Sequence, residues 1–196
     1  MDILQYLDMG LFGFGKSKID KRKEDWIIEA KNWYDQGNSL AKLGKDQEAI
    51  VCYSQAIRLN PEDLRAWSNK GFALNKLERY EESIICYNQV IRFNSDDPNA
   101  WFNRGNALAN LKKFEEAIPC YDKALSLDSE DLRALFNKAN SLANLKKFEE
   151  SVECFDKVIK KNPGYPYALR YKGIALKKLG RDEEAENCFA KDKELE

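Results

Sequence analysis

Histidine is absent from this 196-residue sequence, and its absence narrows the chemistry that the chain can perform. Imidazole is the side chain that most often serves as a general base or a metal ligand near neutral pH. His-assisted serine or cysteine nucleophiles and His-ligated metals are therefore excluded. We expect no enzymatic activity, no catalytic residues, no bound metal and no cofactor.

Two further features are missing: a long apolar run and an excess of charge of one sign. No apolar stretch approaches the roughly 20 residues that span a bilayer, and we expect no secretory signal. The 32 basic and 33 acidic residues give a net charge of −1, so bulk charge attracts neither nucleic acid nor cations.

The cysteines number five, an odd count that argues against a closed disulfide framework. A reducing, cytoplasmic location fits best.

A repeat of 34 residues is the dominant feature of the sequence. Cysteine, an aromatic residue, a small residue and leucine each return at this interval. Self-similarity at such a period is the sequence signature of stacked helical units. The four sets are Cys52, Cys86, Cys120, Cys154 and Cys188; Tyr53, Tyr87, Tyr121, Phe155 and Phe189; Gly37, Gly71, Gly105, Ala139 and Gly173; and Leu40, Leu74, Leu108, Leu142 and Leu176.

Each repeat predicts two helices joined by a short polar turn. Trp67, Gly71 and Leu74 are spaced by four and three, which places them on one helical face. The small residue allows the paired helix to approach closely, and an aromatic side chain such as Tyr87 fills the space beside it. The cysteines, one per hairpin, are interpreted as packing residues, too far apart for disulfides. One hairpin cannot bury its apolar face alone, so neighbouring hairpins stabilise each other by stacking.

The repeat resembles the tetratricopeptide repeat, and residues 30–63 match that pattern best. The resemblance extends over five in-phase copies, which we assign to residues 26–196. It implies an all-α fold, a right-handed superhelix (α-solenoid) of antiparallel helix hairpins. It also implies a concave groove, lined by the first helix of each pair, that binds extended peptides or partner helices. The best-matching copy carries Trp33, Gly37, Leu40, Ala49, Tyr53, Ala56 and Pro61.

Two departures from the family pattern lie in the C-terminal repeats. Leu135 and Leu169 stand where earlier repeats have tryptophan. Asp192 stands where the other repeats have alanine or valine. An acid at this position suits a terminal solvating cap rather than an interior repeat.

The groove face of the first helices is expected to be basic, amide-rich and aromatic. This face carries eight basic residues and only one acid, Asp35. The eight are the five basic residues of the candidate site together with Lys42, Lys177 and Lys178. Basic residues of this kind steer the association of an acidic partner. The candidate peptide-binding residues are Lys31, Asn38, Arg65, Asn69, Phe72, Lys76, Phe102, Asn103, Asn106, Arg133, Phe136, Asn137, Asn140, Tyr167, Arg170 and Tyr171.

Three of these residues, Asn69, Asn103 and Asn137, occupy one repeat position and suggest an asparagine ladder. An amide both donates and accepts hydrogen bonds, so a row of amides can hold a peptide backbone without reading its side chains. The alternative is that asparagine is simply common at this position and points at water.

Residues 1–25 lie outside the repeats and predict a short amphipathic helix followed by a basic linker. Ile3, Leu4 and Leu7 share one helical face. We expect this segment to cap the array or to mediate packing between copies in a homo-oligomer, and a further alternative is that it plugs a groove, its own or that of a neighbouring copy. Docking on an anionic membrane is the less favoured alternative.

The stretch from Gly10 to Ser17 satisfies the phosphate-binding pattern GxxxxGK[ST]. That motif requires a preceding strand in a parallel sheet, and the rest of the sequence predicts only helical hairpins. A chance match is therefore the favoured interpretation, and NTP binding is an unfavoured alternative function.

The leading functional hypothesis is a protein-interaction scaffold or adaptor. Its partner would be a protein or peptide that offers an extended, acidic or polar segment to the groove. Binding of single-stranded nucleic acid by a basic, aromatic groove is the alternative from another class, and it is less favoured.

Overall fold

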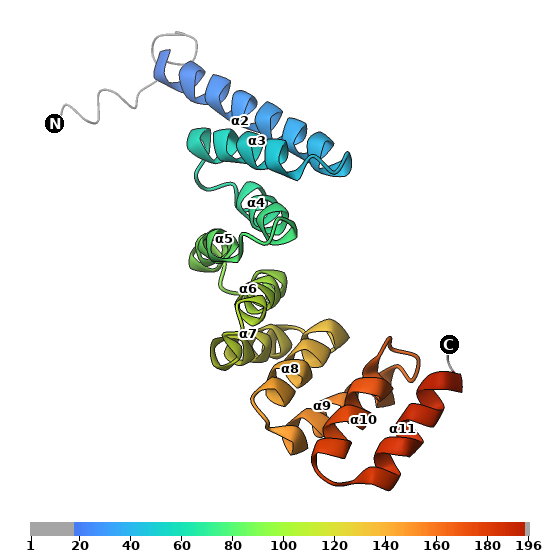
Figure 1. The fold of residues 1–196 in the computed structure, drawn as a ribbon. Coiled ribbons are helices and arrows are strands. Elements are labelled where there is room, and N and C mark those ends of the chain that lie inside the picture. The colour runs from blue at the N-terminus through green and yellow to red at the C-terminus, as the bar shows by residue number, and fades with distance from the viewer. Residues whose placement is uncertain (1–17, 195–196) are drawn as a thin grey trace, which may run out of the picture.

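Ten α-helices and no strand make up residues 18–194, the part of the chain that the computed structural model describes. They form five antiparallel hairpins stacked in chain order (Figure 1), which confirms the predicted α-solenoid. The hairpins are α2 (Lys18–Lys42) with α3 (Asp46–Leu59), α4 (Leu64–Lys76) with α5 (Tyr80–Phe93), α6 (Pro98–Asn110) with α7 (Phe114–Leu127), α8 (Leu132–Asn144) with α9 (Phe148–Lys161), and α10 (Ala168–Lys178) with α11 (Asp182–Glu194).

The first helix of every hairpin lies on the inner side of a curved stack. Neighbouring first helices, such as α4 and α6, approach within contact distance, whereas no such contact joins neighbouring second helices within residues 18–194. The stack therefore bends toward its first helices, and Figure 1 shows the resulting arc from α2 to α10. The predicted groove face lies on this inner side.

The first helix begins earlier than the sequence analysis predicted. α2 starts at Lys18 and runs for 25 residues, so the predicted linker before residue 26 is helical from residue 18 onward. Residues 18–25 contain neither glycine nor proline. The helix of the first repeat can therefore propagate backward through them at little cost. The rest of the N-terminal segment, including Gly10–Ser17, lies outside the described residues.

The two helices of each hairpin meet where a small residue faces a buried aromatic ring. A Cβ atom placed on Gly37 would lie 2.6 Å from Cε1 of Tyr53, and Tyr53 is almost completely buried. The equivalent rings of Tyr87, Tyr121 and Phe155 are fully buried as well. The predicted close approach of the paired helices is thus confirmed.

Aspartates cap the inner helices of three repeats. The carboxylate of Asp63 accepts hydrogen bonds from the backbone N–H groups of Arg65 and Ala66 at 3.1 and 3.4 Å. Asp97 and Asp131 cap α6 and α8 in the same way. Tyr165 replaces this aspartate in the fifth repeat. There α10 starts only at Ala168, after Tyr167 in the left-handed region with φ of 64°.

The expectation that Asp192 solvates the end of the array is wrong. The side chain of Asp192 is only 13% exposed, and its carboxylate lies 2.8 Å from Nε of Arg170. Asp192 therefore joins the last helix to the inner helix α10 through an ion pair. The rest of α11 remains largely exposed, as expected for the last helix of a stack.

Gly37→Ala should destabilise the protein by about 1 kcal/mol, and Gly71→Ala should have a smaller effect. Alanine gains about 0.5–1 kcal/mol over glycine in a helix, whereas overpacking a filled core costs about 1–3 kcal/mol. The clash is closer at Gly37, since a Cβ on Gly71 would lie 3.0 Å from the nearest atom of Tyr87. Urea unfolding of the two variants measures the difference. Equal stability of both variants would contradict this packing argument.

Candidate functional site

A hydrogen-bonded amide network joins the first two repeats on the inner face. Oδ1 of Asn38 accepts a hydrogen bond from the Tyr53 hydroxyl at 2.9 Å and another from Nδ2 of Asn69 at 2.8 Å. The same Asn69 amide lies 3.2 Å from the Tyr34 hydroxyl. The Asn69 side chain is therefore occupied within the protein.

The same network recurs two repeats later. Oδ1 of Asn106 accepts hydrogen bonds from the Tyr121 hydroxyl at 3.0 Å and from Nδ2 of Asn137 at 2.8 Å. Both networks link the inner helix of one repeat to the inner helix of the next, α2 to α4 and α6 to α8. They fix the relative position of these helices along the groove.

The junction between the second and third repeats lacks this network. Phe72 stands where the other networks have Asn38 or Asn106, and its ring is 58% exposed. The hydroxyl of Tyr87 is consequently buried without a hydrogen-bond partner. The Asn103 side chain makes no hydrogen bond to any described residue. The three asparagines of the predicted ladder are thus not equivalent, and only Asn103 has its amide uncommitted.

Most of the basic side chains predicted for the groove are ion-paired. Arg65 lies 3.0 Å from the carboxylate of its neighbouring cap Asp63. Burial alone would raise the pKa of Asp63, but the hydrogen bonds from Arg65 and the helix amides hold that pKa below its ordinary value. The other pairs are Arg133 with Asp131 at 2.8 Å, Lys76 with Asp46 at 2.6 Å, Arg170 with Asp192 at 2.8 Å and Lys177 with Glu186 at 3.6 Å.

The expected strongly basic groove is therefore largely neutralised. Lys31, Lys42 and Lys178 have no ion pair with any described residue, and they lie toward the two ends of the array. Sequence reasoning missed the partner acids because the capping aspartates and Asp46 lie outside the inner-face pattern. An aspartate two residues before an arginine, as in Asp63 and Arg65, is the signal that predicts such a pair.

The predicted aromatic residues divide between the core and the surface. Phe102 is only 8% exposed and lies beneath the Arg133 guanidinium, 4.8 Å from its ring centroid. Phe102, one of the candidate peptide-binding residues, is therefore part of the core rather than of the groove surface. Phe136 packs with Tyr165 and Tyr171, with ring centroids 5.3 and 5.7 Å apart.

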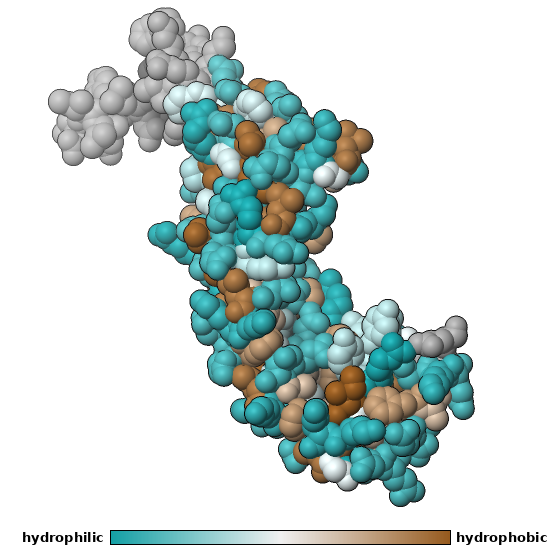
Figure 2. Space-filling view, viewed as in Figure 1, coloured by the Kyte–Doolittle hydropathy of each residue, from teal (hydrophilic) through white to brown (hydrophobic). Residues whose placement is uncertain are grey.

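An exposed apolar surface lies on α10 above this aromatic packing. Tyr171 and Ile174 are 43% and 45% exposed, and Tyr167 one turn earlier is exposed as well. Residues spaced by four and three share one helical face. The space-filling view shows hydrophobic side chains gathered in a hollow over the C-terminal repeats (Figure 2).

Three pockets follow the inner face from one end to the other. The first, about 330 Å³, lies between Lys42 and Phe72. The middle one, about 350 Å³, is lined mainly by amides, among them Asn140 and Asn144. The third, about 510 Å³, includes Tyr171, Ile174, Lys146 and Lys178. The groove therefore has two apolar ends that carry lysines and an amide-rich centre.

The cysteines offer no nucleophile at this site. All five thiols are buried and free, and burial raises the pKa of each above its ordinary value, for Cys86 to about 11. A protonated, enclosed thiol is unreactive. Within residues 18–194 no cluster of histidine, cysteine or carboxylate side chains has a metal-binding arrangement. No helix in this part of the chain is both long and apolar enough to cross a membrane.

The stacked hairpins and the groove on their inner side define a helical-repeat protein. Sequence comparison agrees: a family model described as tetratricopeptide repeat matches residues 98–131 and 132–165, and one described as TPR repeat matches residues 37–77 and 71–112. These matches cover the greater part of the chain, and the protein belongs to the tetratricopeptide repeat family. No curated protein sequence matches the chain.

Solved structures share this fold at low sequence identity. A crystal structure of the MamA protein is 18% identical, with a TM-score of 0.81 over 85% of this chain and 91% of that chain. MamA residues 41 to the end from Desulfovibrio magneticus RS-1 are 19% identical, with a TM-score of 0.82 over 85% and 94%. YrrB, described as a TPR protein with an unusual peptide-binding site, is 21% identical, with a TM-score of 0.77 over 92% and 93%.

Asn69→Ala should destabilise the protein by about 1–2 kcal/mol, whereas Asn103→Ala should change its stability by less than about 0.5 kcal/mol. Each lost internal hydrogen bond costs about 0.5–1.5 kcal/mol, and Asn69 makes two. Asn103 is a matched control because it occupies the same repeat position without such bonds. Chemical denaturation measures both. If the Asn103 variant were as unstable as the Asn69 variant, the Asn103 side chain would have to make internal hydrogen bonds as well, which would contradict its uncommitted state.

The free energy of unfolding should fall as the pH rises from about 9 to 11. The pKa of Cys86 rises from its ordinary value of 9.0 to about 11 in the folded chain. A raised folded pKa stabilises the native state below the unfolded pKa, and this contribution is lost as pH rises through the folded value. Urea unfolding at several alkaline pH values measures the loss. Cys86→Ser should reduce the slope of the profile, to which the other four buried thiols still contribute, and an unchanged slope in that variant would refute the assignment.

Proposed function

We propose that the inner groove binds an extended segment of a partner protein and that the chain serves as a protein-interaction scaffold or adaptor. The observation that carries this proposal is the exposed apolar surface of Tyr171 and Ile174 beside a pocket of about 510 Å³. Large apolar side chains gathered in a concave pocket indicate a binding site. The partner segment would place an apolar side chain there.

The unpaired lysines supply the charge preference of the groove. Lys178 and Lys146 line the apolar pocket at the C-terminal end, and Lys42 lines the pocket near Phe72 at the other end. An acidic group beside each apolar contact would meet one of these lysines. The preferred segment is therefore acidic at both ends rather than uniformly acidic.

The centre of the groove would hold the segment through amide hydrogen bonds. The side chains of Asn103 and Asn140 make no hydrogen bond to any described residue, and Asn140 lines the amide-rich pocket. An amide offers a donor and an acceptor, which suits a peptide backbone. The amides proposed to contact the peptide are therefore those of Asn103 and Asn140, and no longer the predicted ladder of Asn69, Asn103 and Asn137.

Fold similarity is consistent with this proposal. YrrB, which shares the fold, is described as having an unusual peptide-binding site. The five buried, unpaired thiols favour a reducing compartment such as the cytoplasm.

Single-stranded nucleic acid is the less favoured ligand. Phosphate binding depends on free cations along the path of the strand, and in this groove five of the eight predicted cations are paired with carboxylates. A mixed oligonucleotide that bound the chain with a steep dependence on salt would reverse this preference.

Replacing both Tyr171 and Ile174 with serine should weaken the binding of a groove ligand at least tenfold. The ligand would be a peptide selected against the wild-type chain from a library of random extended peptides. Burial of one large apolar side chain is worth about 1.5–3 kcal/mol, and 1.4 kcal/mol is tenfold in Kd. Isothermal titration calorimetry measures the change.

Ile85→Ser is the matched control. Ile85 is similarly exposed, but it lies on the second helix α5, away from the inner face. The control should bind the selected peptide with the wild-type Kd. A double variant that binds normally, or a control that loses binding equally, would refute the groove assignment.

A further inference from the structure

Tryptophan side chains fill the outer grooves between successive second helices in the middle of the array. Trp67 packs against a buried cluster that includes Ile50 of α3 and Cys86 of α5, and its indole N–H donates to the carbonyl oxygen of Pro61 at 2.9 Å. Trp101 occupies the next groove and donates to the carbonyl oxygen of Ser95 at 2.8 Å. The repeat thus contains a position built for an indole ring.

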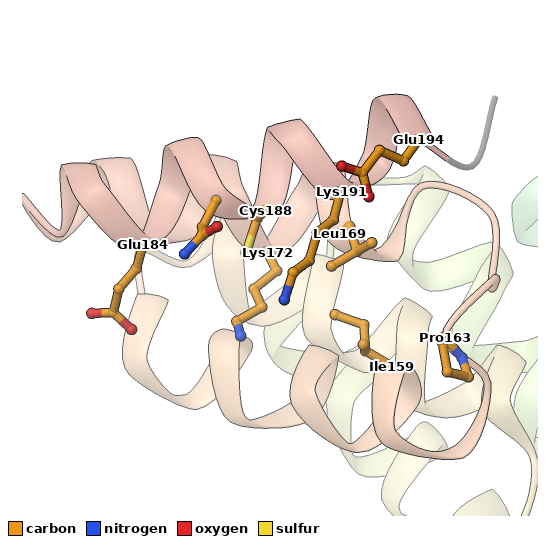
Figure 3. Close-up of a pocket in the computed structure, with 9 residues that line it drawn as sticks. Ile159, Pro163, Leu169, Lys172, Glu184, Cys188, Lys191 and Glu194 are labelled. Carbon is orange, nitrogen blue, oxygen red and sulfur yellow. The ribbon is translucent and has the colours of Figure 1, made fainter.

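Leucine leaves this position partly empty in the last repeat. Leu169 stands where the earlier repeats have Trp67 and Trp101, and a pocket of about 500 Å³ opens beside it. Figure 3 shows Ile159, Pro163 and Leu169 around the pocket, with Cys188 on the opposite helix. These residues form an apolar floor between α9, α10 and α11.

The carbonyl oxygen that would accept a hydrogen bond from an indole at this position is also present, and no donor among the described residues occupies it. The first part of the turn before α10 repeats that before α4, although α10 begins later in its repeat. Tyr165 N–H donates to the Asn162 carbonyl at 3.1 Å, as Asp63 N–H donates to the Asn60 carbonyl at 3.2 Å. Within the described residues no donor reaches the carbonyl oxygen of Pro163, which corresponds to that of Pro61.

The other leucine position differs in this respect. Leu135 also borders a pocket, of about 350 Å³. There the corresponding carbonyl oxygen, that of Ser129, already accepts a hydrogen bond from Nζ of Lys161 at 3.0 Å. The pocket at Leu169 is therefore the better acceptor site for an indole.

A free indole is available at the opposite end of the same chain. Trp26 is 53% exposed on α2, whereas the other three tryptophans are partly buried. Ile27 and Ile28 beside it are each 59% exposed. This apolar surface lies in the N-terminal half of α2.

We propose that the pocket at Leu169 is an indole site that takes Trp26 of a second copy of this chain. The charges that line the pocket are balanced, Glu184 and Glu194 with Lys172 and Lys191, so the match rests on the indole position of the repeat and on the exposed Trp26. Donor and acceptor lie at opposite ends of the chain. The contact is therefore heterologous and joins copies head to tail. It uses the outer face and leaves the inner groove open.

Two single variants test the proposal by sedimentation velocity. Trp26→Ala removes the donor, and Leu169→Trp fills the acceptor with the chain's own indole. Each variant alone should associate about 30-fold or more weakly than the wild type, the effect expected when a buried interface tryptophan is lost. A mixture of the two should form a one-to-one dimer, because Trp26→Ala retains the pocket and Leu169→Trp retains the free Trp26.

Leu135→Trp is the control, since it fills the pocket that lies outside the proposed contact. It should associate like the wild type. Circular dichroism and peptide binding in the inner groove should be unchanged in Trp26→Ala and Leu169→Trp, which separates this proposal from the proposed function. A monomeric wild type at all concentrations, wild-type association of Leu169→Trp, or a mixture that stays monomeric would overturn the proposal.

Discussion

The close contact between a small residue and a buried aromatic ring is the interaction on which the rest of the structure depends. Gly37 faces Tyr53 so closely that a Cβ atom would clash, and glycine makes the same kind of contact in every repeat but the fourth, where Ala139 shares a buried cluster with Phe155. It sets the separation of the two helices in a hairpin and, through it, the surface that each hairpin offers to the next. Because stability comes from stacking, this local contact also shapes the inner groove. The Tyr53 ring takes part in both, since its hydroxyl reaches Asn38 on the inner face.

The inner face consequently alternates with a period of two repeats rather than one. Asn38 with Asn69, and Asn106 with Asn137, are locked into internal networks, whereas Phe72 breaks the pattern between them. Amide groups whose hydrogen bonds hold neighbouring helices in place are not available to bind a ligand. The uncommitted groups, Asn103 among them, are therefore the ones that a partner would contact. On the outer face, too, equivalent positions of different repeats can be compared. Trp67 and Trp101 occupy the position of Leu169 in their own repeats, which identifies the pocket at Leu169 as an indole site.

The fold could be predicted almost completely from the sequence, because the 34-residue period defines every hairpin. The groove could be predicted only in outline. A helical period places Arg65 and Phe102 near the inner face, but it does not show that Asp63 neutralises the first or that Arg133 covers the second. Such partners come from caps and from neighbouring repeats, which a single-helix pattern ignores. The start of α2 was missed because helix propagation beyond a repeat leaves no mark in the repeat pattern. Asp192 was misassigned because its partner Arg170 is 22 residues away.

Binding of an extended segment in the inner groove, with an apolar side chain held on α10, can be observed by NMR titration of the isotope-labelled chain with a peptide selected against it. The backbone amide signals of α10, including Tyr171 and Ile174, should shift most, followed by those near Asn103 and Asn140 and by those of α9, whose Phe155 lines the same pocket. The signals of α5 should stay unchanged. Shifts confined to the second helices, or to the turns between hairpins, would contradict binding in the inner groove.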